Sequence, residues 1–381
     1  MPGSPIAYPD TALAAIRAKV AAYDWHEMPE ISPGGDRWAY GTDMQYLREL
    51  CAYWLETYDW RRCEARLNAL PNRFAEIDGQ RIHFIHVRSA VKGAAPLLLT
   101  HGWPGSVLEF LDVIPLLSAR HDLVIPSLPG YGLSGKPAAP IGPRRTAALW
   151  DRLMREELGY HSYVAQGGDW GGVVTGWLGA NHSIAHGGGC AAIHLNMFGV
   201  RAPVAPETPE EQAWAKAALD FREREGAYMR VQMTKPQSLS YGMMDSPVGV
   251  AAWIVEKFHR WSDRRGADGS DSIENAFTKD QLLDNIMLYL LTRTFNTATW
   301  FYRGALEEGM VLPKDARVSV PTGIAVFPGE PFAFPPRSLV ERSYDVVRWT
   351  AMPRGGHFAA MEMKGVFAEE VLAFLGQVEV T

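Results

Sequence analysis

The segment QGGDWGG at 166–172 places Asp169 between two pairs of glycines. A strand-like run, HSYVAQ at 161–166, precedes it, and a helix-like run, VVTGWLGANH at 173–182, follows it. Glycines on both sides of a polar residue permit a turn from strand to helix so sharp that neighbouring side chains must be almost absent. The pattern predicts a nucleophile elbow, a turn that exposes one reactive side chain, with a carboxylate where serine is more familiar.

Polar residues also follow three other strand-like runs. HGWPGS at 101–106 comes after PLLLT, Glu330 ends FPGE in the run GIAVFPGE, and His357 lies in RGGHFAAME after VVRWTAM. Because the loops at the carboxyl ends of parallel strands converge on one crevice, we expect these residues to meet Asp169 there.

Three of these side chains form a familiar chain order. Asp169, Glu330 and His357 follow one another as nucleophile, acid and histidine, the order of the α/β-hydrolase arrangement. Taken alone, a histidine beside glycines is more often a solvated loop residue, and a glutamate after a strand is more often a surface charge. Their order, with each residue at a strand end, favours a catalytic triad.

An aspartate nucleophile selects the kind of carbon attacked. A carboxylate that attacks a carbonyl forms an anhydride, which is uphill, whereas one that attacks a saturated carbon forms an ordinary alkyl ester. The substrate is therefore expected to be an epoxide or a haloalkane. Water must then hydrolyse the ester, with His357 as general base oriented by Glu330. The backbone N–H groups of Trp103 and Trp170 are expected to hold the oxyanion.

The leaving group separates the two substrate classes. An alkoxide leaves poorly, so an epoxide enzyme needs an acid that stays protonated near neutral pH, and tyrosine suits this role. A halide needs only hydrogen-bond donors, of which Trp170 is one candidate. The residues alone leave four tyrosines open as ring-oxygen donors, and at least two of them are expected only to pack: Tyr228, Tyr241, Tyr289 and Tyr302.

Changes of pattern along the chain divide it into four segments. Residues 1–75 are helix-like and rich in aromatics, residues 76–200 and 301–381 alternate β-rich with helix-like runs, and residues 201–300 are charged and helix-like. Strands that alternate with helices predict a mostly parallel sheet flanked by helices on both faces. We therefore expect an α/β core in two parts, interrupted by a helical lid.

Composition excludes several classes of protein. The 381 residues are 47% hydrophobic, enough for one large core, and a formal charge of −6 without long runs of one sign gives no case for nucleic-acid binding. Three cysteines match no metal site and predict no disulfide. Neither a signal peptide nor a membrane span is apparent, so we expect a soluble, cytoplasmic protein.

Several separated motifs resemble one family. The chain is similar over nearly its whole length to the microsomal-type epoxide hydrolases, including the juvenile hormone type. The motifs that carry the resemblance are HGWPGS, PSLPGYGLSG, QGGDWGG, IHLNMFG, TKPQ…DSPVGVAAWIVEKF, VPTGIAVFPGE, RGGHFAAME and the aromatic run that begins YLRELCAYWLETYDW. The resemblance implies the α/β-hydrolase fold and, for residues 1–75, the N-terminal helical region with which this family wraps its core.

The resemblance also assigns roles to residues. It places the nucleophile on Asp169, the acid on Glu330 and the histidine on His357, in agreement with the choice made from the residues. It places the two ring-oxygen tyrosines on Tyr228 and Tyr302, which leaves the other two tyrosines as packing or pocket-lining residues. Animal microsomal members carry an N-terminal membrane anchor, whereas this sequence begins directly with residues like the soluble region, so we do not expect a membrane location to transfer.

We therefore expect an epoxide hydrolase that converts an apolar epoxide into a vicinal diol through an Asp169 ester. Trp103 and Trp170 are expected to line the substrate pocket, and the reaction needs no metal or organic cofactor. The alternatives are a haloalkane dehalogenase and a non-catalytic ligand-binding protein on the same fold. The expected partners are the epoxide and water, and a homodimer is one alternative for the assembly.

Overall fold

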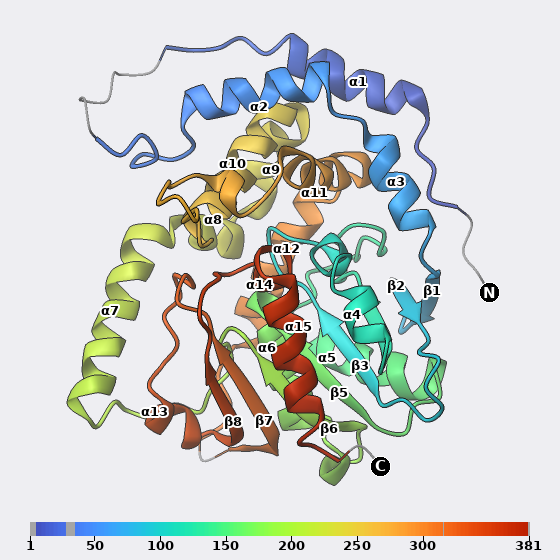
Figure 1. Ribbon diagram of the computed structural model, residues 1–381, viewed down its shortest axis with the longest axis vertical. Helices are drawn as coiled ribbons and strands as arrows, with labels where there is room; N and C mark the ends of the chain where they lie inside the picture. Colours follow the sequence, from blue (N-terminus) through green and yellow to red (C-terminus); the bar gives the residue numbers. More distant parts are fainter. Residues whose placement is uncertain (1–4, 28–34, 315, 380–381) are drawn as a thin grey trace.

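The computed structural model describes residues 5–27, 35–314 and 316–379. Its centre is an eight-stranded sheet in the order β1-β2-β4-β3-β5-β6-β7-β8 (Figure 1). β1 and β2 pair antiparallel, as do β2 and β4, and every other pairing is parallel. The predicted mostly parallel sheet of the α/β-hydrolase fold is confirmed. The strands are β1 (Asn72–Ile77), β2 (Gln80–Val87), β3 (Pro96–Thr100), β4 (Asp122–Pro126), β5 (Tyr163–Gly167), β6 (Cys190–Leu195), β7 (Val318–Val326) and β8 (Tyr344–Ala351).

The central strands are apolar because both of their faces are covered. Leu97 and Leu99 of β3 belong to one hydrophobic cluster, while Leu98 between them belongs to the other. The first cluster includes residues of α4 (Ile114–Ser118) and α15 (Lys364–Leu375), and the second includes residues of α5 (Pro143–Arg152) and α6 (Asp169–Asn181). Figure 1 shows α4 and α15 in front of the sheet, with α5 and α6 behind it. The alternation of strand side chains thus builds two cores, as expected for a buried parallel sheet.

A group of helices lies between β6 and β7 in the chain, and most of it lies above the carboxyl ends of the strands, with α7 beside the sheet (Figure 1). Proline at the first turn of α7, α9 and α10 starts these helices without the loss of a backbone hydrogen bond. Residue 300, the predicted end of the lid, lies inside the last helix of the group. The helices are α7 (Pro209–Glu225), α8 (Ala227–Thr234), α9 (Pro236–Asp245), α10 (Pro247–Arg260), α11 (Lys279–Thr292) and α12 (Phe295–Glu308).

The N-terminal helices pack mainly on this group of helices. α1 (Asp10–Ala21), α2 (Met44–Glu56) and α3 (Trp60–Asn68) run along its outer side (Figure 1). Tyr53 and Tyr58 donate hydrogen bonds of 2.8 and 2.9 Å from their hydroxyls to Asp280 and Asp284 of α11. The division of the chain into four segments remains a prediction, and residues 1–4 and 28–34 of the first segment lie outside the described residues. Two short helices complete the fold: α13 (Arg337–Glu341) and α14 (Ala359–Glu362).

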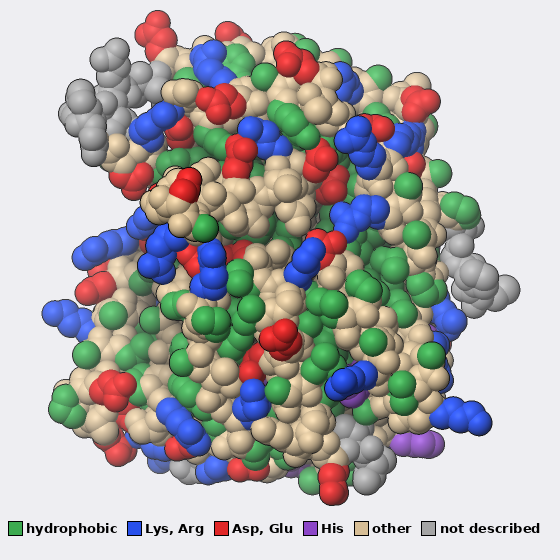
Figure 2. Space-filling view, in the orientation of Figure 1, with side chains coloured by type: hydrophobic (Ala, Val, Ile, Leu, Met, Phe, Trp, Pro, Cys, Tyr) green, Lys and Arg blue, Asp and Glu red, His purple; other side chains and the backbone are tan. Residues whose placement is uncertain are grey.

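Lys and Arg are interspersed with Asp and Glu over the face seen in Figure 2. Cys51, Cys63 and Cys190 are free and buried. Across the described part of the chain, no helix combines the length and the apolar character needed to cross a bilayer.

Candidate active site

Asp169 is the first residue of α6 and follows β5 directly, in the strained turn that the sequence predicts. Its φ is +49°, in the left-handed region that residues with a side chain rarely adopt. The turn requires glycine, because a Cβ atom at Gly171 would lie 1.9 Å from the Thr100 carbonyl oxygen. A Cβ atom at Gly102 would lie 2.2 Å from Oδ1 of Asp169, so the HGWPGS loop also approaches the carboxylate closely. The strain positions one carboxylate at the ends of the central strands.

The structure brings the other two triad candidates to this carboxylate. Glu330 follows β7 and His357 follows β8, and both are buried. His357 Nδ1 lies 2.9 Å from Oε2 and 3.1 Å from Oε1 of Glu330. Its other nitrogen, Nε2, lies 3.5 Å from Oδ2 of Asp169. Nε2 therefore faces the Asp169 carboxylate, which a nucleophilic mechanism would convert into an ester.

Two neighbouring carboxylates control the charge of His357. Burial by itself lowers the pKa of this histidine, because a charged ring loses its hydration. The charge of Glu330 and then the contacts with Asp169 outweigh burial and hold the pKa well above its usual value. The free enzyme therefore favours the imidazolium form of His357.

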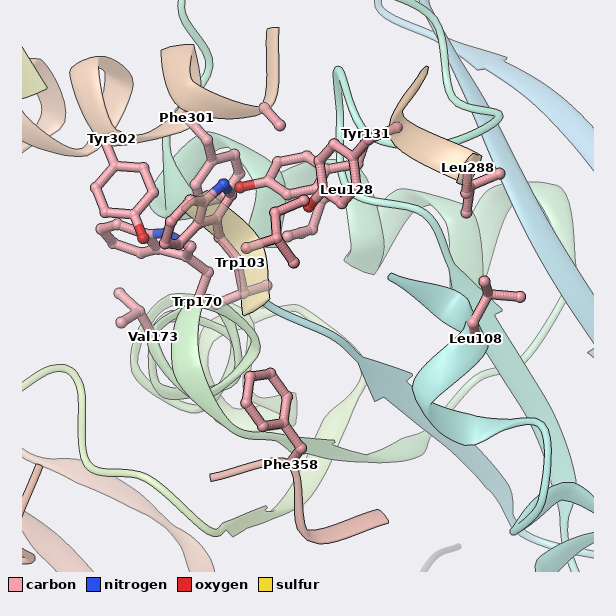
Figure 3. Packing of buried hydrophobic residues seen from close by; sticks show 14 of the residues in the cluster. Trp103, Leu108, Leu128, Tyr131, Trp170, Val173, Leu288, Phe301, Tyr302 and Phe358 are labelled. Carbon is pink, nitrogen blue, oxygen red and sulfur yellow. The ribbon is translucent and has the colours of Figure 1, made fainter. Parts of the chain in front are cut away.

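Backbone N–H groups reach the carboxylate from its other side. The N–H of Trp103 donates a hydrogen bond of 2.8 Å to Oδ1 of Asp169. Trp170 is the second residue of α6, so its N–H belongs to the first turn, where backbone donors have no partner within the helix. These are the two residues whose N–H groups the sequence assigned to the oxyanion. Their indole rings are buried and lie over the start of α6 (Figure 3).

Of the four candidate tyrosines, Tyr228 and Tyr302 lie at this site. Tyr228 is near the start of α8 and Tyr302 is on α12, and their exposed fractions are 4% and 1%. The Tyr228 ring stacks on Trp103 at 5.2 Å between centroids, and the Tyr302 ring meets Trp170 edge-on at 4.7 Å, as Figure 3 shows for the second pair. Burial above all, and also the charge of Asp169, raise the pKa of both tyrosines well above the usual value. Both hydroxyls therefore remain protonated and able to donate.

The other two tyrosines have different surroundings. Tyr289 is buried, and its hydroxyl donates a hydrogen bond of 2.8 Å to the carbonyl oxygen of Gly105, which supports the HGWPGS loop. Tyr241, expected to pack or to line the pocket, is instead 74% exposed on α9. Its neighbourhood in the sequence resembles the family, but that part of α9 turns this ring to the surface.

A set of hydrogen bonds that the sequence did not predict joins the loop of His357 to the end of α10. The N–H of His357 donates to the carbonyl oxygen of Trp261 at 2.8 Å. The carboxylate of Glu362 accepts from the N–H of Asp263 at 2.8 Å and from that of Phe358 at 2.9 Å. We call these contacts the loop clamp. The only sequence signal for it was the presence of Glu362 at the end of RGGHFAAME.

One further carboxyl group near the site was missed, that of Glu109. It lies three residues after HGWPGS, and in the sequence it resembles an ordinary charged residue of a helical turn.

No candidate metal site is found in residues 5–27, 35–314 and 316–379. Nowhere in these residues do three His, Cys, Asp or Glu side chains come together as metal ligands.

Comparison with known proteins identifies two family regions. The family model described as epoxide hydrolase N terminus matches residues 3–110, and the model described as alpha/beta hydrolase fold matches residues 95–224. Epoxide hydrolase 1 of Sus scrofa is 34% identical over 375 residues, which cover 90% of this chain and 82% of that protein. Juvenile hormone epoxide hydrolase 2 of Ctenocephalides felis is 30% identical over 397 residues, which cover 97% of this chain and 84% of that protein.

Solved structures agree over almost the whole chain. The Aspergillus niger epoxide hydrolase superposes with a TM-score of 0.83 at 29% identity, covering 99% of this chain and 97% of that one. The juvenile hormone epoxide hydrolase of the silkworm Bombyx mori superposes with a TM-score of 0.85 at 29% identity, covering 98% and 93%.

Proposed function

The chain belongs to the epoxide hydrolases of the α/β-hydrolase fold, and we propose that it adds water to its substrate through a covalent alkyl ester of Asp169. The observation that carries this proposal is the position of the Asp169 carboxylate in a strained turn, between the Trp103 N–H on one oxygen and His357 on the other. A general base acting through water tolerates looser placement, whereas a nucleophile must approach a carbon in line at about 3 to 3.5 Å. The rigid turn suits the second requirement.

In the first half-reaction, an oxygen of Asp169 attacks one ring carbon from the side opposite the ring oxygen. The C–O bond of the ring breaks, and the developing alkoxide takes a proton from the hydroxyl of Tyr228 or Tyr302. Support comes from the burial of both hydroxyls and from the raised pKa values, which keep them protonated. The product of this step is a hydroxyalkyl ester of the enzyme.

In the second half-reaction, His357 removes a proton from water while the water oxygen attacks Cγ of Asp169. The N–H groups of Trp103 and Trp170 hold the oxyanion, and Glu330 orients the imidazole through Nδ1. Collapse of the intermediate breaks the ester C–O bond, and the proton on His357 passes to the departing alkoxide. A vicinal diol leaves, and Asp169 carries the oxygen of the water. The remaining proton of the water passes from the Asp169 carboxyl group to the tyrosinate left by the first half-reaction, which restores the free enzyme.

The electrostatics of the free enzyme support this order of events. Asp169 is one of the groups that raise the pKa of His357, and esterification removes its charge. The pKa of His357 therefore falls when the ester forms. A histidine that is a poor base in the free enzyme becomes a better base when a base is needed.

The experiment that tests covalent attack is a single turnover in ¹⁸O-water with enzyme in excess over styrene oxide. Covalent attack yields mostly unlabelled diol and a labelled peptide that contains Asp169, because the first diol takes its oxygen from the carboxylate. Fully labelled diol in the first turnover would remove the covalent mechanism. A bromoalkane assayed in parallel tests the dehalogenase alternative, and binding without turnover of either compound would support a non-catalytic protein.

The surroundings of the site also support a class of substrate. Trp103, Trp170 and Trp261 lie with the two tyrosines in one buried aromatic cluster beside Asp169. We propose that the substrate is an apolar epoxide, which would lose little hydration on entering such a site. Comparison of KM for styrene oxide and for glycidol, which differ in polarity, tests this proposal.

Two properties of the whole protein remain proposals. The free buried thiols support a reducing, cytoplasmic location, which fractionation of the source cells would test. A homodimer is proposed from the aromatic character of the N-terminal segment, and light scattering of the purified protein would show a mass near 42.3 kDa if the protein is instead a monomer.

A further inference from the structure

Glu109 is a carboxyl group inside the active-site region that the mechanism above does not use. It lies in a short 3₁₀ helix, Val107–Phe110, immediately after the HGWPGS loop. Together with Asp169 and His357 it lines a cavity of about 20 Å³. A cavity of roughly 10 to 15 Å³ on this scale holds one water molecule, so the space fits a single reactant of that size.

The position of the carboxyl group depends on Gly105. A Cβ atom at Gly105 would lie 1.5 Å from Oε1 of Glu109, so the carboxyl group occupies the space that any other residue at this position would fill. The φ of Gly105 is not in the left-handed region, so its backbone is open to other residues. Space for the Glu109 carboxyl is therefore the structural reason for glycine here.

Two other polar atoms face the same cavity. Gln166 and His357 both line it, and neither Oε1 of Gln166 nor Nε2 of His357 has a hydrogen-bond partner among the residues that the structure describes. A buried water usually has two to four polar partners, and buried polar atoms usually have at least one. The carboxyl of Glu109 and the imidazole of His357 can accept the two hydrogens of one water, and the amide oxygen of Gln166 lies at the same cavity.

We propose that Glu109 and His357 together hold the water that hydrolyses the Asp169 ester. The inference rests on the covalent mechanism proposed above. The water gives one proton to Nε2 of His357, and its other hydrogen is held by a carboxyl oxygen of Glu109 while its oxygen bonds to Cγ of Asp169. This hydrogen bond directs the lone pair of the water oxygen, and Glu109 takes no proton, so the atoms balance as in the second half-reaction.

The pKa of Glu109 responds to both of its charged neighbours. Burial above all raises this pKa to about 8, the charge of His357 lowers it, and the charge of Asp169 raises it. Esterification removes the Asp169 charge and favours neutral His357, so its two effects on the pKa of Glu109 oppose each other. The role of Glu109 therefore rests on its position at the cavity, where a carboxyl oxygen accepts a hydrogen bond from water in either charge state.

The test measures the two half-reactions separately with styrene oxide, by acid quench and intact-protein mass. In Glu109→Gln, alkylation is expected to stay within about threefold of wild type, while ester hydrolysis slows by about 10²-fold and the adduct accumulates. The matched control is Asp112→Asn, because this half-buried carboxylate lies three residues after Glu109, pairs with Arg66 of α3 and does not line the cavity. It should leave both half-reactions unchanged.

A second variant moves the carboxyl group without removing it. Gly105→Ala places a methyl group where Oε1 of Glu109 lies, and it should also slow hydrolysis more than alkylation. This variant keeps the proposal testable if Glu109→Gln does not fold. A wild-type rate of ester hydrolysis in Glu109→Gln, or equal slowing of both half-reactions, would overturn the proposal.

Failure of the underlying mechanism gives a different result. If a folded His357→Gln variant binds styrene oxide but never gains its mass, the covalent mechanism fails. If that variant does gain the mass while Glu109→Gln and Gly105→Ala never accumulate it, only the role of Glu109 fails.

Discussion

The two buried tyrosines allow a quantitative test of how the epoxide ring opens. Their ring centroids lie 6.0 Å apart and the two side chains share a hydrogen bond, so both hydroxyls are close enough to reach one epoxide oxygen. A hydrogen bond to a charged group contributes about 1.5 to 3 kcal/mol, and about 1.4 kcal/mol corresponds to tenfold in rate. Tyr228→Phe or Tyr302→Phe alone should therefore slow alkylation by about 10- to 100-fold.

The double variant separates shared from independent donation. If both hydroxyls bind the same oxygen, each single variant keeps one donor, and loss of both leaves the alkoxide without any. The double variant should then lose more than the product of the two single losses and be nearly inactive. Tyr241→Phe is the matched control, because this tyrosine is 74% exposed on a neighbouring helix.

The assay is stopped-flow tryptophan fluorescence under single-turnover conditions, with Trp103 and Trp170 in contact with the two tyrosine rings as the reporters. Small, strictly multiplicative losses in the double variant would refute shared donation. In the wild type, the alkylation rate should not fall as pH rises to about 10, because the tyrosine pKa values lie well above this. A fall centred near pH 8 would refute the assignment of the acid.

Three further outcomes are expected. His357→Gln should accumulate the Asp169 ester, seen as an intact-protein mass increase equal to the mass of the substrate, because only ester hydrolysis needs the base. Gly171→Ala should lower the free energy of unfolding by about 1 to 3 kcal/mol or more in chemical denaturation, since its Cβ atom would meet the Thr100 carbonyl oxygen at 1.9 Å. The pKa of His357 is higher in the folded than in the unfolded protein, where it is about 6.5, so protonation of His357 stabilises the folded state. This contribution is complete at pH values below the unfolded pKa and is lost as pH rises through the folded pKa. Glu330→Gln should reduce this pH dependence of the free energy of unfolding, measured by denaturant titration.

The triad candidates could be located from sequence because each of them lies in the loop or turn that follows a strand. Apolar runs long enough to cross a sheet mark the strands, and topology then brings their carboxyl ends together. Asp169, Glu330 and His357 meet in the structure for this reason. The glycines around Asp169 also predicted a sharp turn at this residue, and its φ of +49° agrees with that prediction.

The remaining functional residues could not be located in this way. Tyr228 and Tyr302 lie on helices, and which helical face is turned to the site depends on packing between α8 and α12 that no local pattern records. Resemblance to the family was needed to choose them. Glu109, Asp263 and Glu362 are charged residues with no motif around them, and only long-range packing shows that they lie close to the reacting groups or to the loop of His357.

The loop clamp has a consequence for how substrate enters and product leaves. Its hydrogen bonds attach the backbone of His357 and Phe358 to the residues just beyond α10, directly and through Glu362. We therefore expect the end of α10 and the loop of His357 to move together. A swing of α10 away from the sheet would withdraw the imidazole from the ester. Substrate entry and product release that leave His357 in place must therefore use the displacement of other helices. Exchange of amide hydrogens should then be slower at Asp263, His357 and Phe358 than in α8 and α9.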